Sequence, residues 1–209
     1  MKKFFQDFLN NNFPPGFITL YFFGLNKYKS VIDLGCGFES VLKIFKNDFK
    51  LGVEIFEEYI SKSKKKKIHH EYIMDNILSS RVNSLLKNFE AVICFDVLEH
   101  LTQEESLNLI NSIEENNPKF IAFRTTSEYV QQDEYHDNPY QIHKSYLNSK
   151  FFKERGYKVF GVDGPSFLLV KNNRVVTDLP ISKIIFSYLL RPIYYFLPDK
   201  SLNYIAIKN

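Results

Sequence analysis

The sequence contains no tryptophan and only two cysteines and two methionines among its 209 residues. Cys36 and Cys94 are too few for a disulfide framework, so we expect buried, reduced thiols in a cytoplasmic protein. No stretch contains about 18 consecutive apolar residues, which argues against a membrane-spanning helix. The amino-terminal segment lacks a long apolar stretch and a small-residue cleavage site, so we expect no signal peptide.

The chain has only a small excess of positive charge, because 27 basic and 24 acidic residues leave a net charge of +3. A balance this close to neutrality gives no reason to expect a nucleic-acid partner. The one concentrated basic cluster is Lys62 with residues 64–67, which we interpret as a solvated helix end. Hydrophobic residues make up 44% and charged residues 24% of the chain, as is typical of a globular domain.

Beyond residue 28, short apolar stretches alternate with stretches of helical spacing. The apolar stretches predict strands at 29–35, 51–55, 71–75, 89–97 and 119–126. Helices are predicted between them at 40–46, 56–67, 80–88 and 103–117, the last introduced by a capping box of Thr102 and Glu105. This alternation predicts βαβ crossovers and a parallel sheet that is covered on both faces.

The ends of the chain are organised differently. Short helices are predicted at 1–12 and 17–25, and a helix that ends at Gly156 is predicted at 143–156. Strands are predicted at 157–163 and 202–208. Residues 180–198 are apolar and aromatic around Arg191-Pro192, and we expect one broken helix or two short ones. This segment suits a lid or a packing helix, or else a peripheral contact with a membrane. We therefore divide the chain into an amino-terminal helical cap (1–27), a core (28–164), an amphipathic lid or insertion (165–200) and a last core strand (201–209).

A glycine loop, Asp33-Leu34-Gly35-Cys36-Gly37, follows the first predicted strand. Glycines allow backbone N–H groups to approach a ligand, which suits a dinucleotide or S-adenosylmethionine. Asp33 discriminates between them, because a pyrophosphate would face a carboxylate whereas S-adenosylmethionine carries an ammonium, a sulfonium and no phosphate. Glu54, which ends the second strand 19 residues after Gly35, suits the ribose hydroxyls of either ligand. A plain strand-to-helix turn and a nicotinamide dinucleotide site remain alternatives.

Four motifs, VIDLGCG, GVEI, MDNI and FEAVICFDVLEHL, occur in order along the chain. Together they resemble the motif series of the class I S-adenosylmethionine-dependent methyltransferases, over about residues 28–165 and the final strand. The resemblance implies an α/β fold with a doubly wound, seven-stranded, mostly parallel sheet, Rossmann-like, with an antiparallel last strand. It also implies which residues contact the cofactor. Asp33, Gly35 and Gly37 would line its methionine part, and Glu54 would bind the ribose. Asp75, Asn76 and Ile77 would border the adenine, and Phe95 and Asp96 would face the methionine and methyl group.

Acidic and histidine residues follow the fourth and fifth strands, where Asp96, Glu99, His100 and His143 could converge. Three roles are open to them: a general base, with His100 and His143 as the catalytic candidates, a metal site, or helix capping and loop bonding. The set resembles a metal site in 3′-terminal small-RNA 2′-O-methyltransferases and some quinone-biosynthesis O-methyltransferases, with Asp96 where those families carry Glu. We expect no metal, and we place His69, His70 and His136 at surface or loop positions.

The acceptor is left open by these motifs. Our first hypothesis is O-methylation of a small or lipid- or saccharide-linked acceptor, without nucleic acid, in a pocket walled by the amino-terminal helices and residues 165–200. Peripheral membrane contact through 180–198 is left open beside it. A second is metal-assisted 2′-O-methylation of an RNA 3′ end. A third is a non-catalytic module that binds the nucleotide cofactor, and a fourth is redox chemistry with a nicotinamide dinucleotide.

Overall fold

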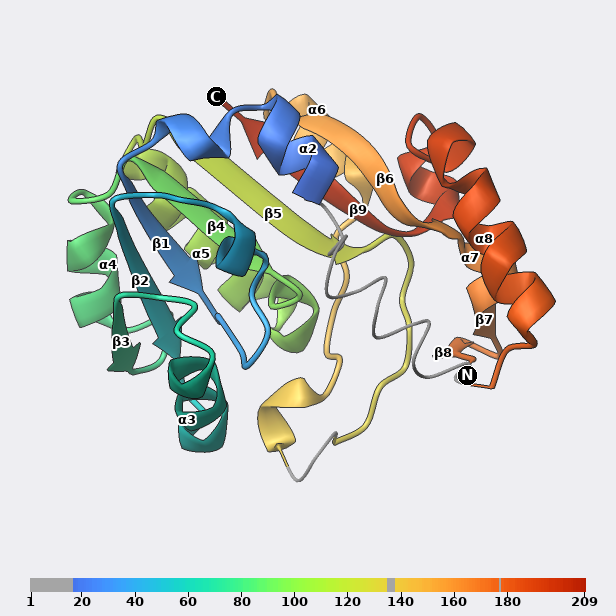
Figure 1. Cartoon of the computed structure of the whole chain (residues 1–209), viewed down its shortest axis with the longest axis horizontal. Helices are drawn as coiled ribbons and strands as arrows, with labels where there is room; N and C mark the ends of the chain where they lie inside the picture. Colours follow the sequence, from blue (N-terminus) through green and yellow to red (C-terminus); the bar gives the residue numbers. More distant parts are fainter. Residues whose placement is uncertain (1–16, 135–137, 177) are drawn as a thin grey trace.

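The computed structural model describes residues 17–134, 138–176 and 178–209 (Figure 1). Its centre is a seven-stranded sheet with the order β3-β2-β1-β4-β5-β9-β6. The strands are β1 (Ser30–Leu34), β2 (Phe49–Glu54), β3 (Glu71–Met74), β4 (Ala91–Phe95), β5 (Phe120–Thr126), β6 (Lys158–Pro165) and β9 (Ser201–Lys208). Strands β1 to β5 pair in parallel, and β9 runs antiparallel to both β5 and β6. The predicted fold class is therefore confirmed.

Both faces of the sheet are covered by helices and turns. Successive side chains of a strand point to opposite faces, so each strand contributes to both cores. Ile32 and Leu34 of β1 pack with one set of helices: α4 (Ser80–Leu86), α5 (Gln103–Glu115) and α6 (Ser149–Glu154). Val31 packs on the other face with α2 (Phe17–Phe22) and the 3₁₀ turns η1 (Leu25–Lys27) and η2 (Val41–Ile44). Cys36 and Cys94 are buried and free, as expected.

Helix ends follow the sequence signals closely in the first half of the core. Thr102 Oγ1 accepts the N–H of Glu105 at 3.2 Å, and Glu105 Oε2 accepts the N–H of Thr102 at 2.8 Å, so the predicted capping box is present. Helix α3 (Glu57–Lys65) has acidic residues in its first turn and lysines in its last, which suits the helix dipole. The basic cluster that begins at Lys62 therefore starts in the last turn of a helix.

Two predicted helices are much shorter than expected. Residues 40–46 form only η2, and residues 143–148 are not helical, so the predicted helix 143–156 is reduced to α6. In the second case, backbone groups bond elsewhere: the N–H groups of Lys144 and Ser145 donate to Glu99 O. The predicted helix 1–12 and His136 lie outside the described residues.

Among its described residues, the segment after β6 includes two helices, and residues 181–194 form a single one of them. It contains α7 (Ser166–Leu169), the hairpin of β7 (Val170–Lys171) and β8 (Arg174–Val175), and then α8 (Ile181–Tyr194), with Pro192 inside its last turn. The turn η5 (Pro198–Lys200) leads into β9. None of the helices in the described ranges has both the length and the hydropathy needed to cross a bilayer.

The hydroxyl of Tyr204 links β9 to the non-helical segment before α6. The side chain is fully buried and donates a hydrogen bond to Leu147 O at 2.6 Å. We predict that Tyr204→Phe lowers the free energy of unfolding by about 1–2 kcal/mol, because it leaves a buried carbonyl unpaired. Denaturant unfolding measures this, with Tyr129→Phe, the same change at an exposed position, as the control. Equal stability of the two variants would contradict the prediction.

Candidate active site

A cavity of about 1000 Å³ opens at the carboxyl ends of the central strands. Parallel strands place the loops that follow them at one edge of the sheet, which is where ligands bind in such folds. Nine of the residues singled out in the sequence line this cavity: Asp33, Gly35, Gly37, Glu54, Asn76, Ile77, Phe95, Asp96 and His100. Asp75, Glu99 and His143 are not among the lining residues.

The glycine loop needs its two glycines for different reasons. Both have a positive φ, +70° at Gly35 and +55° at Gly37, which disfavours residues with a side chain. A Cβ at Gly35 would lie 2.3 Å from Val97 Cγ2, whereas a Cβ at Gly37 would meet no atom within 4 Å. Gly35 therefore permits close packing, and Gly37 leaves open space beside the cavity.

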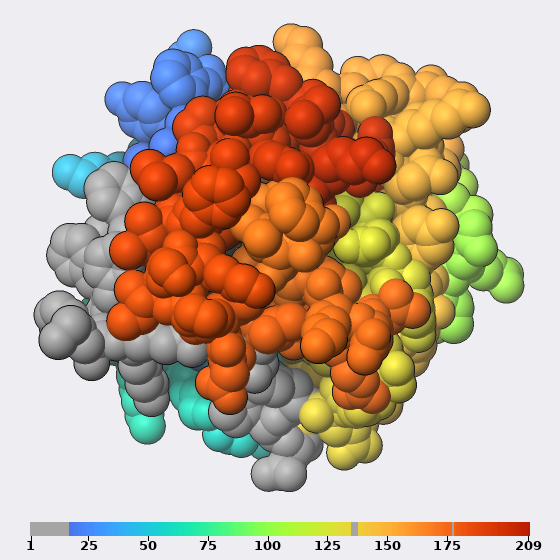
Figure 2. Space-filling view, turned by 90° about the vertical axis from the view of Figure 1, so that its right-hand side faces the viewer, coloured from blue at the N-terminus to red at the C-terminus, as the bar shows by residue number. Residues whose placement is uncertain are grey.

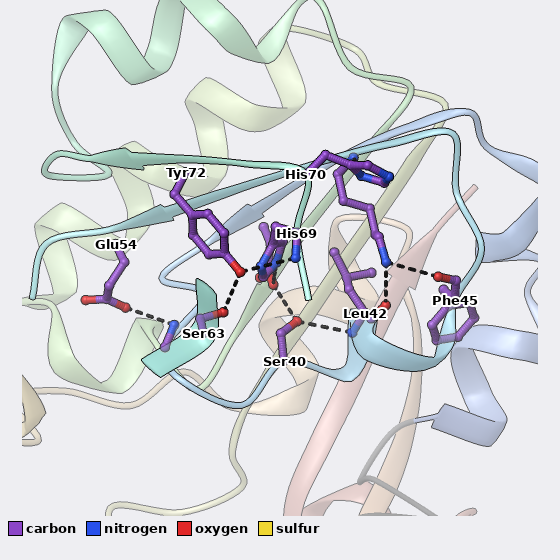
Figure 3. A network of polar contacts seen from close by, with 11 residues as sticks. Ser40, Leu42, Phe45, Glu54, Ser63, His69, His70 and Tyr72 are labelled. Carbon is purple, nitrogen blue, oxygen red and sulfur yellow. Dashed lines mark hydrogen bonds and ion pairs between the residues drawn. The ribbon is translucent and has the colours of Figure 1, made fainter. Parts of the chain in front are cut away.

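No α-helix follows the loop, since η2 has only four residues. The helix predicted at 40–46 therefore offers no α-helical dipole to a ligand at this loop. Lys50 Nζ donates to Leu42 O and Phe45 O, which satisfies two carbonyls at this short turn (Figure 3). Burial lowers the pKa of Lys50.

Glu54 holds the loop in place through backbone hydrogen bonds (Figure 3). Its Oε2 accepts the N–H of Gly37 at 2.9 Å, and its Oε1 accepts those of Ile55 and Phe56 at 2.9 and 3.0 Å. Burial raises the pKa of Glu54, and these three donors oppose the rise by stabilising the charged form. A carboxylate has about four acceptor positions, so Oε2 keeps one for a ligand hydroxyl.

Asp33 lies in a buried polar network. Its Oδ2 accepts a hydrogen bond from Ser40 Oγ at 2.5 Å and lies 2.9 Å from His69 Nε2. His69 lies in the loop before β3, as expected, but its side chain is fully buried and not at the surface, whereas His70 is exposed. Gly52 makes this contact feasible, since a Cβ there would lie 3.2 Å from the His69 ring. A glycine inside a strand was the signal available in the sequence.

Asp75 and Asn76 form a turn at the end of β3. Asp75 Oδ1 accepts the N–H of Asn76 at 2.7 Å, and Asn76 Oδ1 accepts that of Leu78 at 2.9 Å. Asn76 and Ile77 line the cavity, while Asp75 lies outside the lining and 3.9 Å from Arg81. Asp75 therefore takes part in this turn, and its contact with an adenine stays a prediction.

Asp96 is paired with an arginine that the sequence analysis missed. Its φ is +55°, its N–H donates to Arg124 O at 2.8 Å, and its carboxylate pairs with the Arg124 guanidinium. Arg124 also donates to Asp163 Oδ2 at 2.6 Å. The sequence did offer a signal for this pair, namely an arginine inside an apolar strand. A buried arginine needs an acidic partner.

A second polar cluster lies beside the cavity at Glu99, His100 and His143. One potential ligand atom from each residue lies within 4.8 Å of the others, and Asp96 is not part of this group. Glu99 is buried and accepts a hydrogen bond from Thr125 Oγ1 at 2.8 Å. The cluster offers one carboxylate and two imidazoles, as a metal ion or a proton transfer would require.

The two histidines of this cluster are poised as neutral imidazoles. Nδ1 of His143 lies 2.6 Å from Val130 O, and Nδ1 of His100 lies 3.4 Å from Ile142 O. A proton on each Nδ1 leaves the Nε2 lone pair free to accept a proton or bind an ion. Burial, and the cost of a second positive charge beside His100, lower the pKa of His143 to about 4, and burial lowers the pKa of His100.

The far end of the cavity is lined by Tyr140, Gln141 and Lys144. These residues belong to the turn η4 (Pro139–Gln141) and the segment after it. Nothing in their sequence spacing marked them, because their position depends on how the long connection after β5 folds back over the sheet.

The Asp33–His69 pair makes a prediction about stability. We expect His69→Leu to lower the free energy of unfolding by about 2–3 kcal/mol, because it removes a donor from a buried carboxylate. His69→Gln, which retains an N–H donor, is the matched control and should lose less. Denaturant unfolding of Asp33→Asn, His69→Leu and the double variant measures the coupling between the two residues. Additive losses would show that the pair contributes no interaction energy.

Comparison with known proteins begins with sequence. No protein-family model matches the chain. An uncharacterized protein of Methanocaldococcus jannaschii is 28% identical over 138 residues, which cover 66% of this chain. The match spans only 59% of that relative's length.

Solved structures resemble the chain more completely. A SAM dependent methyltransferase from Archaeoglobus fulgidus is 16% identical with a TM-score of 0.55, over 91% of this chain and 91% of that one. The methyltransferase domain of bacterial CtHen1 is 14% identical with a TM-score of 0.52, over 92% and 95%. The small RNA methyltransferase HEN1 is 14% identical with a TM-score of 0.54, over 86% of this chain and 23% of that one. The chain therefore has the class I fold of the S-adenosylmethionine-dependent methyltransferases.

Proposed function

We propose that this chain is an S-adenosylmethionine-dependent methyltransferase that methylates an oxygen of a small or lipid- or saccharide-linked acceptor. The observation that carries the proposal is Glu54, a buried carboxylate that holds the glycine loop and lines the cavity. It stands on a fold whose solved examples include methyltransferases. An acid at this strand end suits a ribose, and the open space at Gly37 suits a ligand close to the backbone.

The cavity residues fit the parts of this cofactor. Glu54 would accept a ribose hydroxyl at the free position of Oε2, and Asn76 and Ile77 would border the adenine. Asp33 uses only Oδ2 for Ser40 and His69, which leaves Oδ1 for the cationic methionine end. The volume of about 1000 Å³ leaves room for an acceptor beside the cofactor.

The protein's share of the chemistry is mainly positioning. When bound, S-adenosylmethionine supplies an already activated methyl group, so the chain has to align the acceptor and exclude water. His100 lines the cavity, and its Nε2 would accept the proton that an acceptor hydroxyl loses on methylation. Tyr140, Gln141 and Lys144 would contact the acceptor.

Calorimetry tests the cofactor. We predict that S-adenosylhomocysteine binds and NADH does not, and that Glu54→Gln weakens binding about tenfold or more, because a neutral amide replaces an acceptor of several N–H groups. The matched control is Glu57→Gln, an exposed acid on α3, which should bind like the parent. Tight NADH binding, or an unchanged Glu54→Gln, would overturn the proposal.

Metal-assisted 2′-O-methylation of an RNA 3′ end is the second candidate function. Two observations favour it: the grouping of Glu99, His100 and His143, and the likeness to the HEN1 methyltransferases in fold. These side chains would hold a divalent ion through two imidazole nitrogens and a carboxylate oxygen. Asp96, which the sequence analysis placed in this group, is instead occupied by Arg124.

Transfer of a labelled methyl group separates the two functions. We predict label in a total lipid extract, unaffected by EDTA, and none in a single-stranded RNA with a 3′-terminal 2′-hydroxyl. A matched RNA with a 2′-deoxy terminus is the control for the site of transfer. Label in the hydroxyl-terminated RNA alone, lost with EDTA and restored by Mn²⁺, would establish the second function instead. His143→Ala should then abolish the metal effect without abolishing cofactor binding.

A further inference from the structure

Helix α8 exposes many of its large apolar side chains to solvent and buries few residues. Its buried positions are Ile184 and Ser187, and the guanidinium of Arg191 lies 3.8 Å from Asp163 and over the ring of Tyr188. The side of α8 that faces the protein therefore combines an apolar residue with a hydroxyl and a guanidinium. A helix with such a buried side normally presents polar residues to solvent on the other side.

Large apolar side chains occupy the opposite side of α8 and the turn after it. They are Ile185, Phe186, Leu189, Ile193 and Phe196, which we call the apolar face of α8, and they are 45–76% exposed. Residues 185, 189 and 193 are spaced by four and share one side of the helix. Figure 2 shows this part of the surface, where the orange to red atoms of residues 180–200 cover much of the view.

These side chains project outward instead of forming a pocket. Leu189 is 69% exposed and Phe196 is 76% exposed, and neither lines the site cavity. A rigid partner would need matching indentations for each projecting side chain. A lipid interface deforms around them, and their insertion removes apolar area from water.

The charge of this part of the chain selects the kind of lipid. Residues 164–209 contain six basic and two acidic residues. Three of the basic residues pair with acids elsewhere in the chain: Arg174 with Asp133, Arg191 with Asp163 and Lys208 with Glu114. Lys183 and Lys200, near the two ends of α8, are exposed and form no ion pair within the described ranges. Two unpaired lysines at the ends of an apolar face complement anionic headgroups.

We propose that the apolar face of α8 docks the protein on an anionic lipid surface, with Lys183 and Lys200 at the headgroups. The helix would lie in the plane of the interface, over a length of about 21 Å for its 14 residues. Arg191 connects it, through Asp163 and Arg124, to Asp96 at the cavity. The docking helix would therefore be connected to the site by ion pairs. The docking proposal does not depend on which cofactor the site binds.

Co-sedimentation with vesicles tests the docking surface. We expect the protein to bind phosphatidylcholine vesicles that contain phosphatidylglycerol, and to bind pure phosphatidylcholine vesicles more weakly. The double variant Leu189→Ser, Phe196→Ser should lose about tenfold or more in partitioning into both, because the inserted apolar area is gone. Lys183→Gln should lose about fivefold on the anionic vesicles only.

The controls separate docking from folding and from self-association. Met74→Ser changes an equally exposed apolar residue on the far edge strand β3 and should bind vesicles like the parent. Circular dichroism and calorimetric cofactor binding check that each variant is folded. No vesicle binding, or binding unchanged in the double variant, would overturn the proposal. So would light scattering that shows a dimer that the double variant dissociates, because a second copy would then cover this face.

Discussion

A buried carboxylate at the end of β1 organises the elements that shape the site. Asp33 bonds to Ser40, which caps η2, and to His69, which precedes β3. The network continues through Tyr72, whose hydroxyl bonds to Ser63 of α3 and accepts the N–H of His69 (Figure 3). A buried carboxylate in this position needs hydrogen-bond donors around it. Their contacts hold the glycine loop in place, since only the short turn η2 follows it.

The second constraint lies at the other side of the cavity. Arg124 pairs with the carboxylates of Asp96 and Asp163, and Arg191 of α8 lies 3.8 Å from the other carboxylate oxygen of Asp163, Oδ1. A buried arginine needs such partners. Asp96 follows β4, Asp163 lies in β6, and Arg191, which approaches Asp163, lies in α8. The same contacts therefore position a cavity residue and seat the helix that presents its apolar face to solvent. The cavity and α8 are thus joined by one charged network.

Much of the core could be predicted because its signals are local. Strands of apolar residues were located within a few residues of their observed ends, as for 29–35 against Ser30–Leu34. The capping box of α5 needed only residues three apart. The helix predicted at 143–156 failed because Leu147 and its neighbours bond to β9 and to Glu99, partners distant in sequence. The burial of the His69 side chain was missed for the same kind of reason, since its partner lies 36 residues away.

By itself, the sequence determined the order of strands and helices, the glycine loop and the acid that supports it. Hydrophobic periodicity and glycine placement are properties of neighbouring residues, so no folding was needed to recognise them. Only the tertiary structure decided that Asp33 contacts His69, and that Asp96 pairs with Arg124 and not with the group of Glu99 and the two histidines. Each of these depends on which buried charges meet, and burial is set by the packing of distant segments.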